Sequence, residues 1–279
     1  MKLQKILNRL QKLHPKEIDL SLDRIKNLCK KLGNPQDEIK CIQVCGTNGK
    51  GSTISFLRSI LREANIRCNV YTSPHVKSIN ERFIYNDEMI NDNDLSDLLS
   101  KIEEVNNNQP LTYFEALTAA FFYGCKRYKE NLVIAEFGLF GRGDAVNILK
   151  KNLCNIVTSC SEDHLDWLPE NDQTIERIIF EKTSSLLNSN IVVAKQNSYE
   201  IVECIKKNLS NNSANKYFFN ENYNFVLKEN NFFYYEDKHG GLKIPRPNLN
   251  GEFQLENAAT AIATLRVLED IKIKDQHII

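Results

Sequence analysis

The stretch VCGTNGKGST occupies residues 44–53 and places three glycines and one lysine between two apolar segments. The run CIQVC (residues 41–45) leads into it and is typical of a short buried strand. The segment SFLRSILREA (residues 55–64) follows and has apolar residues at helical spacing. The glycines therefore lie where a strand is predicted to turn into a helix.

The glycine-rich stretch differs from the common phosphate loop, whose pattern is G-x-x-x-x-G-K-S/T. Aligned on Gly49 and Lys50, that pattern requires a glycine at position 44 and a hydroxyl at position 51. The chain has Val44 and Gly51 there. The pattern alone does not decide whether the stretch binds phosphate.

The chemistry of the stretch nevertheless favours phosphate binding. Backbone N–H groups at a helix N-terminus have no partner inside the helix, and the helix dipole adds roughly half a positive charge there. Glycine lets the main chain approach a ligand closely. Lys50 adds a mobile positive charge, and Ser52 and Thr53 offer hydroxyls near a Mg²⁺-bound phosphate. We predict a nucleoside triphosphate loop, the alternative being a glycine-rich turn that caps a helix.

Strands alternating with helices predict the fold class. Apolar segments rich in Val and Ile, without polar alternation, suit strands covered on both faces; they lie at residues 41–45, 67–72, 131–137, 154–159 and 190–195. Helical patterns lie at residues 55–64, 94–105, 113–128 and 174–187, and one more follows residue 250. We predict an α/β fold with a mostly parallel sheet, helices on both faces and a P-loop. Aromatic runs parted by polar turns predict a small antiparallel hairpin region near residues 215–245.

Composition limits the classes of partner. The chain has 279 residues, enough for one large domain or two modest ones, and its 36 basic and 36 acidic residues give zero net charge. A protein that binds nucleic acid along its backbone usually carries a basic excess, so we expect no nucleic-acid partner. No run approaches the roughly 20 apolar residues of a membrane span, so we expect no membrane partner.

The N-terminus and the cysteines indicate a cytoplasmic protein. The first residues, MKLQKILNRLQKLHPKE, lack the continuous apolar stretch of a signal peptide. None of the eight cysteines forms a C-x-x-C pair. Those in or beside apolar runs are predicted to be core thiols of a reducing compartment; they are Cys41, Cys45, Cys68, Cys154 and Cys160.

Several segments in register carry a resemblance to a known family. GTNGKGST resembles the phosphate loop of the Mur ligase superfamily, where G-T-N-G-K replaces the usual spacing. Further segments are similar to those of the folylpolyglutamate synthase and dihydrofolate synthase family: LGNPQ (32–36), YTSPHVKSINERF (71–83), TYFEALTAA (112–120), AEFGLFGRGDAVN (135–147), EDHLDWL (162–168), EK (181–182) and GEFQLENAATA (251–261). One such motif is weak evidence, whereas this many in the same order are specific.

The resemblance implies an ATP-dependent ligase that adds L-glutamate to a reduced folate or dihydropteroate through an acyl phosphate. Such an enzyme holds the triphosphate, neutralises charge on the transferred phosphoryl group and aligns its reactants. We expect a monomer. The alternatives are an inactive ATP-binding fragment, another Mur-type amide ligase and a generic P-loop NTPase. The sequence does not separate addition of the first glutamate from addition of later ones.

The resemblance also assigns residues to ATP and to catalysis. The residues expected to bind ATP are Thr47, Asn48, Gly49, Lys50, Gly51, Ser52 and Asn257. The residues expected to take part in catalysis are Lys50, His164 and Lys182. The alternative for Asn257, a polar residue near a helix start, is strong on the sequence alone.

Two Mg²⁺ sites are implied. Glu136 ends a buried strand, and a carboxylate at the carboxyl end of a parallel strand suits a hard cation. The resemblance assigns Glu136 and Ser73 to the first Mg²⁺, and His164 and Lys182 to the second. Lys182 would become a carbamate by reaction with CO₂, which needs a depressed pKa because the neutral amine is the nucleophile. The alternatives are a paired acid, a turn hydroxyl, a structural histidine and a solvated lysine beside Glu181.

A pteroate pocket is implied by two segments. Their residues are Thr112, Tyr113, Phe114, Glu115, Gly143, Asp144 and Ala145. Aromatic rings suit a flat pterin or benzoyl group, and an aspartate suits a donor-rich ring edge. The alternative for Phe114 is plain helix packing.

The chain also departs from the family. Phe140 stands where the family has glycine, Gly143 where it has a larger apolar residue, Val146 where it has threonine and Phe253 where it has histidine. Phe140 puts the shape of the folate pocket in doubt. We expect residues 1–270 to form the ATP-binding central domain and residues 271–279 to begin a linker to a C-terminal domain absent from this chain. The chain as given is therefore expected to bind ATP weakly and not to ligate.

Overall fold

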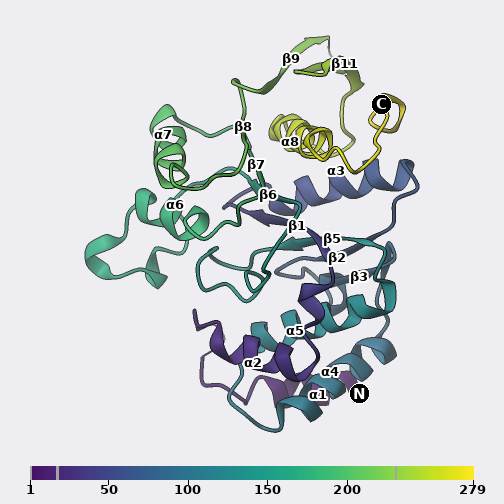
Figure 1. Cartoon of the computed structure of the whole chain (residues 1–279), viewed down its shortest axis with the longest axis vertical. Helices are drawn as coiled ribbons and strands as arrows, with labels where there is room; N and C mark the ends of the chain where they lie inside the picture. The colour runs from purple at the N-terminus through teal and green to yellow at the C-terminus, as the bar shows by residue number, and fades with distance from the viewer. Residues whose placement is uncertain (1, 17–18, 230) are drawn as a thin grey trace. The chain divides into compact units, whose positions relative to one another are not determined.

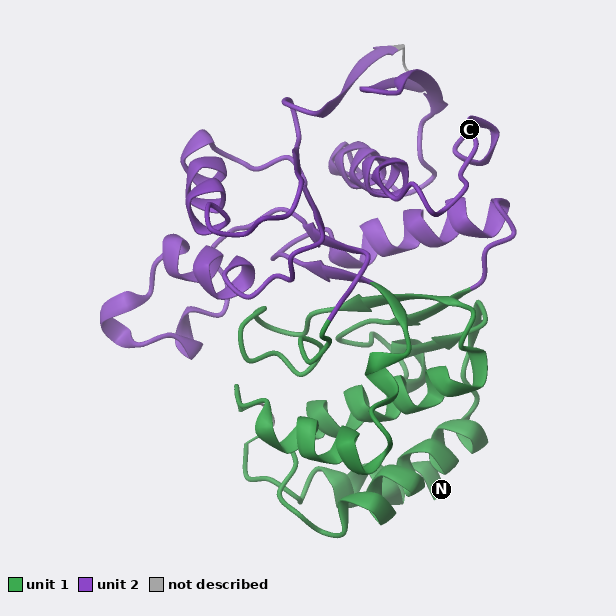
Figure 2. Cartoon of the chain, in the orientation of Figure 1, with its two compact units in different colours: residues 1–41, 68–150 green, residues 42–67, 151–279 purple. Residues whose placement is uncertain are grey.

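A computed structural model describes residues 2–16, 19–229 and 231–279. The chain divides into two compact units, unit 1 with residues 1–41 and 68–150, and unit 2 with residues 42–67 and 151–279 (Figure 2). No predicted site residue falls on the undescribed positions 1, 17, 18 and 230, although the predicted hairpin region includes residue 230 and the predicted central domain includes all four.

Unit 1 contains a mixed set of strands. They are β2 (Cys68–Tyr71), β3 (Phe83–Tyr85), β4 (Glu88–Met89) and β5 (Leu132–Glu136). Their spatial order is β4-β3-β2-β5. β2 and β5 are parallel, whereas β3 is antiparallel to β2 and β4 is antiparallel to β3. The β3–β4 hairpin was not predicted, because its strands are too short to show a pattern.

Helices of unit 1 stack in layers against these strands (Figure 1). They are α1 (Lys2–Leu10), α2 (Asp23–Lys31), α4 (Asp92–Asn106) and α5 (Tyr113–Cys125), with short 3₁₀ turns η1 (Pro35–Asp37), η2 (Ile79–Arg82) and η3 (Lys126–Tyr128). α5 contacts β2 and β3, α2 and α4 pack on α5, and α1 packs on α4. This arrangement explains why α5 is apolar on nearly every side.

A capping box fixes the N-terminus of α5. The Thr112 hydroxyl accepts a hydrogen bond from the Glu115 main-chain nitrogen at 3.2 Å, and Glu115 Oε2 accepts one from the Thr112 nitrogen at 2.7 Å. Two otherwise unpaired N–H groups are thereby satisfied. The box holds the first turn of α5, with Phe114 and Glu115, in one conformation.

Unit 2 is built on parallel strands. They are β1 (Lys40–Cys45), of which residues 42–45 belong to this unit, β6 (Cys154–Val157), β7 (Asn190–Val193) and β8 (Lys216–Phe218). They run in the order β1-β6-β7-β8, each parallel to the next. The predicted strands of both units are present, with ends shifted by up to two residues, so the predicted α/β class is confirmed.

Helices cover both faces of the unit 2 strands. They are α3 (Lys50–Glu63), α6 (Ile175–Thr183), α7 (Tyr199–Asn208) and α8 (Phe253–Val267), with 3₁₀ turns η4 (Leu165–Trp167), η5 (Glu170–Asp172) and η6 (Asp275–His277). α3 packs on α8 and α6 packs on α7. Figure 1 shows the first pair on one side of the strands and the second pair on the other.

The hairpin region is partly as predicted. β9 (Tyr223–Glu229), β10 (Phe232–Asp237) and β11 (Gly240–Pro245) form a separate antiparallel sheet. Residues 216–218 were also assigned to hairpins, which is wrong, because β8 extends the parallel set beside β7. The sequence KYFF has the same aromatic character as the hairpin strands. Its composition therefore does not show that it pairs in parallel with β7.

Burial agrees with the prediction for the cysteines. The five named thiols are buried, and Cys204 is half-buried. Within the described ranges, none of the helices combines the length and the apolar character that crossing a bilayer demands.

Candidate active site

The glycine-rich loop connects β1 to α3 in unit 2. Gly49 is the N-cap of α3, with a φ of +88° and no side-chain cap, so the first N–H groups of the helix face outward. Thr47 and Asn48 anchor the loop, because both main-chain nitrogens donate to the Ser159 carbonyl, at 2.8 and 3.0 Å. The Thr47 hydroxyl donates to the Ser161 carbonyl at 3.1 Å. Thr47 and Asn48 thus hold the loop in place, and their predicted role toward ATP stays a prediction.

Two of the three glycines are required by space and conformation. Gly46 has a φ of +132°, and a Cβ there would collide with the Thr158 side chain. A Cβ on Gly49 would collide with the amide oxygen of Asn257. Gly51 lies in the first turn of α3 without a positive φ, and a Cβ there would meet nothing within 4 Å. The absence of a side chain at Gly51 leaves open space beside the outward-facing N–H groups.

Asn257 belongs to this loop. It lies in the second turn of α8, is 8% exposed, and places its Oδ1 against Gly49. Its Nδ2 donates to Gln254 Oε1 at 3.0 Å, which orients the amide. The structure therefore brings the predicted ATP-binding residues of the loop and Asn257 together. The nearby Phe253, a departure from the family, is 60% exposed.

Two lysines converge on the loop main chain. Lys50 Nζ donates to the carbonyl oxygens of Gly46 and Thr47 at 3.0 and 3.1 Å. Lys182 Nζ, on α6, donates to the same Gly46 oxygen at 3.2 Å. Lys182 is only 1% exposed, so the alternative of a solvated lysine is wrong. Glu181 pairs with Arg177 at 2.6 Å.

The surroundings of Lys182 disfavour its positive charge. Burial lowers the pKa of Lys182, and the positive charge of Lys50 lowers it further. The neutral amine, which is the form that reacts with CO₂, is therefore easier to reach by loss of a proton than in a solvent-exposed lysine. This agrees with the pKa direction that the predicted carbamate requires.

His164 lies between β6 and η4. Its side chain is 39% exposed and approaches Asp163 at 3.2 Å. Burial lowers the pKa of His164, Asp163 opposes this effect, and the charges of Lys182 and Lys50 lower the pKa further. A neutral imidazole is the form that ligates metal. In the part of the chain that the structure describes, no group of three or more His, Cys, Asp or Glu side chains is arranged to hold a metal ion.

Ser73 and Glu136 are neighbours in unit 1. Glu136, at the end of β5, is 5% exposed and accepts a hydrogen bond from the Ser73 nitrogen at 3.1 Å. The Ser73 hydroxyl is buried, and none of the described residues gives it a hydrogen-bond partner. A buried hydroxyl oxygen beside a carboxylate is a donor set that suits Mg²⁺. Whether Glu136 shares an ion with phosphates held at Lys50 stays a prediction, since the two residues belong to different units.

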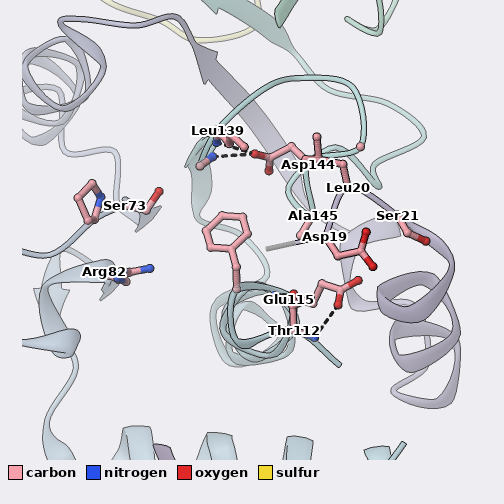
Figure 3. A pocket seen from close by; sticks show the side chains of 14 residues that line it. Asp19, Leu20, Ser21, Ser73, Arg82, Thr112, Glu115, Leu139, Asp144 and Ala145 are labelled. Carbon is pink, nitrogen blue, oxygen red and sulfur yellow. Dashed lines mark hydrogen bonds between the residues drawn. The ribbon is translucent and has the colours of Figure 1, made fainter. Parts of the chain in front are cut away.

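A cavity of about 150 Å³ lies within unit 1 (Figure 3). Six of the seven predicted substrate-binding residues line it: Thr112, Phe114, Glu115, Gly143, Asp144 and Ala145. Tyr113 is not among the lining residues. Figure 3 shows Ser73 and Arg82 on one side of the cavity and Asp19 and Glu115 on the other.

The sequence analysis missed part of the cavity wall. Asp19, Leu20 and Ser21 line it, together with Arg82. The segment containing the first three has no periodicity and no motif that distinguishes it from an ordinary loop. Arg82, within the SINERF motif, was the available signal. Its Nε donates to His75 Nδ1 at 2.9 Å.

Phe114 and Gly138 form the floor of the cavity. A Cβ on Gly138 would overlap the Phe114 ring, so the ring lies directly on the glycine. The ring also contacts that of Tyr71, with centroids 6.1 Å apart. Phe114 therefore packs within the fold and also lines the cavity, so helix packing and a place in the cavity wall do not exclude each other.

Asp144 acts mainly on its own loop. Its Oδ2 accepts hydrogen bonds from the nitrogens of Gly138 and Leu139 at 2.8 and 3.0 Å, and its Oδ1 accepts one from Val146 at 2.9 Å. Both oxygens are thus used to shape the cavity wall, and a direct bond to a ring edge stays a prediction.

Gly143 and Phe140, two departures from the family, both fit the local structure. Gly143 has a φ of +77°, and a Cβ there would press on Leu20 at 3.0 Å, so the larger residue of the family would need this loop to move. The Phe140 ring is 1% exposed and lies outside the set of residues lining the cavity.

A parallel α/β sheet, a glycine-rich turn that opens a helix and two convergent lysines are together typical of proteins with a phosphate-binding loop. The sequence model of the Mur ligase middle domain matches residues 44–265, and the chain belongs to the Mur ligase family. The family predicted from the motifs is confirmed.

Within the Mur ligase family, the chain is similar to dihydrofolate synthase/folylpolyglutamate synthase proteins. Dihydrofolate synthase/folylpolyglutamate synthase of Bacillus subtilis is 34% identical over 201 residues, which cover 69% of this chain and 46% of that protein. A structure of Escherichia coli FolC in complex with DHPP and ADP matches at 31% identity with a TM-score of 0.88, over 99% of this chain and 64% of that one. A Yersinia pestis bifunctional folylpolyglutamate synthase/dihydrofolate synthase, complexed with AMPPNP and a Mn ion, matches at 31% identity with a TM-score of 0.86, over the same shares. The chain spans about half the length of the curated relatives it matches.

Proposed function

We propose that this chain supplies the ATP-binding and folate-binding parts of a ligase that joins L-glutamate to dihydropteroate or a reduced folate. ATP would convert a substrate carboxylate to an acyl phosphate, and the glutamate amine would displace the phosphate. The observation that carries the proposal is the convergence of Lys50 and Lys182 on the Gly46 carbonyl. Two lysine side chains beside the N-terminus of a helix suit a polyphosphate, because its several negative charges would be attracted both to the lysines and to the helix N–H groups.

ATP would bind along the glycine-rich loop. The outward-facing N–H groups of Gly51 and Ser52 would contact its phosphates, and the Lys50 ammonium would turn from the loop carbonyls to the outer phosphate. Asn257, held against Gly49, would face the rest of the nucleotide. The E. coli and Y. pestis relatives bound to ADP and to AMPPNP support this assignment.

Two divalent ions would be held by residues of this chain. Ser73 and Glu136 would hold one, since a buried hydroxyl without a partner lies beside a carboxylate. His164 and a carbamylated Lys182 would hold the other. Bound Mg²⁺ would neutralise charge on the transferred phosphoryl group. The Mn ion of the Y. pestis relative supports a divalent metal, and the second site and the carbamate rest on this proposal.

The carbamate would relieve the strain at the lysine pair. The neutral Nζ of Lys182 would attack CO₂, a nitrogen–carbon bond would form, and the nitrogen would release a proton. The group would change from a cation into an anion. Repulsion from Lys50 would thereby become attraction.

The cavity of unit 1 would receive the pterin end of the folate. The Phe114 ring offers a flat apolar surface, and acids on the opposite wall suit N–H donors. The DHPP in the E. coli relative supports a folate-type ligand. The predicted monomeric state and cytoplasmic location stay predictions.

The test is binding and turnover with defined ligands. Isothermal titration is expected to show binding of Mg-ATP and of dihydropteroate, with dihydropteroate tightening the binding of ATP. ADP release is expected to require both dihydropteroate or a reduced folate and glutamate. Binding of ATP without binding of any folate would favour the alternatives, an inactive ATP-binding module or another Mur-type ligase.

A further inference from the structure

Arg24 joins two acids in the wall of the unit 1 cavity. Its Nε donates to Glu115 Oε2 at 3.0 Å. Its Nη1 donates to Asp19 Oδ2 at 3.0 Å, and its Nη2 donates to the Asp19 carbonyl at 3.2 Å. A planar guanidinium presents donors in a fixed fork, so one side chain of α2 fixes both acids at once.

Glu115 has an acceptor that the fold does not use. Its side chain is 3% exposed, and its Oε2 already accepts from Arg24 and from the Thr112 nitrogen. Its Oε1 is buried, and no described residue is within hydrogen-bonding reach of it. A buried carboxylate oxygen without a donor is costly, which indicates that a ligand in the cavity supplies the donor.

The charges around the two acids leave the cavity wall with the character of a hydrogen-bond acceptor. Burial lowers the pKa of Arg24, but hydrogen bonds and the negative charges of Glu115 and Asp19 outweigh this effect and raise it, so Arg24 remains a cation. His14 also approaches Asp19, at 3.7 Å. With one arginine between two carboxylates, the wall retains acceptor character and would repel a phosphate.

We propose that Arg24 is a positioning residue that presents Asp19 and Glu115 as paired acceptors for the ring N–H groups of an amino-substituted nitrogen heterocycle. Arg24 itself lines no part of the cavity and acts through the two acids. The inference rests on the proposed function, because it specifies which end of a folate-type substrate the cavity selects. The acceptor pair matches a ring amino group and an adjacent ring N–H.

The experiment compares two ligands that differ in one amino group. Pteroic acid and its 2-desamino-2-methyl analogue are titrated into the wild-type chain, Arg24→Met and Arg24→Lys. We expect Arg24→Met to weaken pteroic acid about 10- to 100-fold, in keeping with a charge-assisted hydrogen bond. Binding of the analogue is expected to change by no more than about twofold, and Arg24→Lys to fall between. Lys26→Met, an exposed lysine on the same helix, is the matched control and is expected to leave both affinities unchanged.

A second variant covers the case in which Arg24→Met fails to fold. Glu115→Gln keeps an acceptor for the Thr112 nitrogen but replaces one oxygen with a donor, so only the aminated ligand is expected to lose affinity. Equal losses for both ligands, or no loss for either, would overturn the proposal in either variant. Wild-type protein that binds ATP but neither pteroic acid nor the analogue would instead overturn the proposed function.

Discussion

Lys50 and Lys182 donate hydrogen bonds to the same atom, the carbonyl oxygen of Gly46. One lysine begins α3 and the other lies near the end of α6, so strand ends and helix ends distant in sequence meet at one loop carbonyl. The arrangement gives the loop two positive groups and leaves the buried one with a lowered pKa. The Gly46 carbonyl thus holds the two ammonium groups close together, and this proximity contributes to the lowered pKa of Lys182.

The first prediction is that Lys182 forms a carbamate. With ¹³C-labelled bicarbonate, the wild-type chain is expected to show a carbamate carbon resonance in NMR spectra, and Lys182→Met is expected to lack it. Lys50→Met is expected to weaken the signal, because loss of the neighbouring charge raises the pKa of Lys182 and removes a partner for the anion. Lys207→Met, an exposed helix lysine of the same unit, is the control. An unchanged signal in Lys182→Met would place the carbamate on another amine, and no signal in the wild-type chain would show that none forms.

The second prediction separates two glycines of the loop. Gly49→Ala is expected to lower the free energy of unfolding by about 1–2 kcal/mol or more, since a positive φ is unfavourable for alanine and its Cβ would collide with Asn257. Gly51→Ala is expected to be neutral or stabilising by up to about 1 kcal/mol, because it lies in a helix with open space around it. Urea denaturation measures both. Equal destabilisation by the two changes would contradict this account.

Much of the fold could be predicted because buried parallel strands leave a local signal. The unbroken apolar runs that became β5, β6 and β7 are recognisable without knowledge of their partners. The strand at residues 216–218 was misassigned, because an aromatic run looks the same whether it pairs parallel or antiparallel. Its pairing with β7 is a property of the assembled sheet.

The residues of the candidate site that could be predicted are those that lie in sequence motifs. The depressed pKa of Lys182 followed from the requirement of its chemistry, and the structure supplies burial and Lys50 as the causes. The contribution of Asp19 and the link from Arg24 to Glu115 could not be predicted, because that link spans 91 positions in sequence and has no local pattern. Nor does a sequence reveal that both oxygens of Asp144 are used by its own loop.

The third prediction concerns the floor of the unit 1 cavity. Gly138→Ala is expected to push the Phe114 ring into the cavity and to weaken pteroic acid about tenfold, a typical effect of overpacking. Binding of Mg-ATP is expected to be unchanged. In Phe114→Ala, adding Gly138→Ala is expected to cause little further loss, because the ring that it displaces is gone. Additive losses in the double variant would show that Gly138 acts by another route.

The fourth prediction is a pH dependence of the loop that carries Ser73 and Arg82. The Glu81 carboxylate accepts hydrogen bonds from the nitrogens of Val76, Lys77 and Ser78 at 2.8–2.9 Å, and these bonds hold its pKa below the usual 4.5. A carboxylate with a lowered pKa in the folded state stabilises the loop above its unfolded pKa, and this contribution is lost as pH falls through the lowered value. The protection of the amides of residues 76–78 against hydrogen exchange, measured relative to their intrinsic exchange rates and compared with that of core strands, is expected to fall over that acidic range in the wild-type chain. In Glu81→Gln the exchange should already be faster at neutral pH and lack this step, whereas Glu88→Gln, an exposed acid in β4, should behave as wild type. Protection that stays constant through this range in the wild-type chain would show that the loop does not depend on the charge of Glu81.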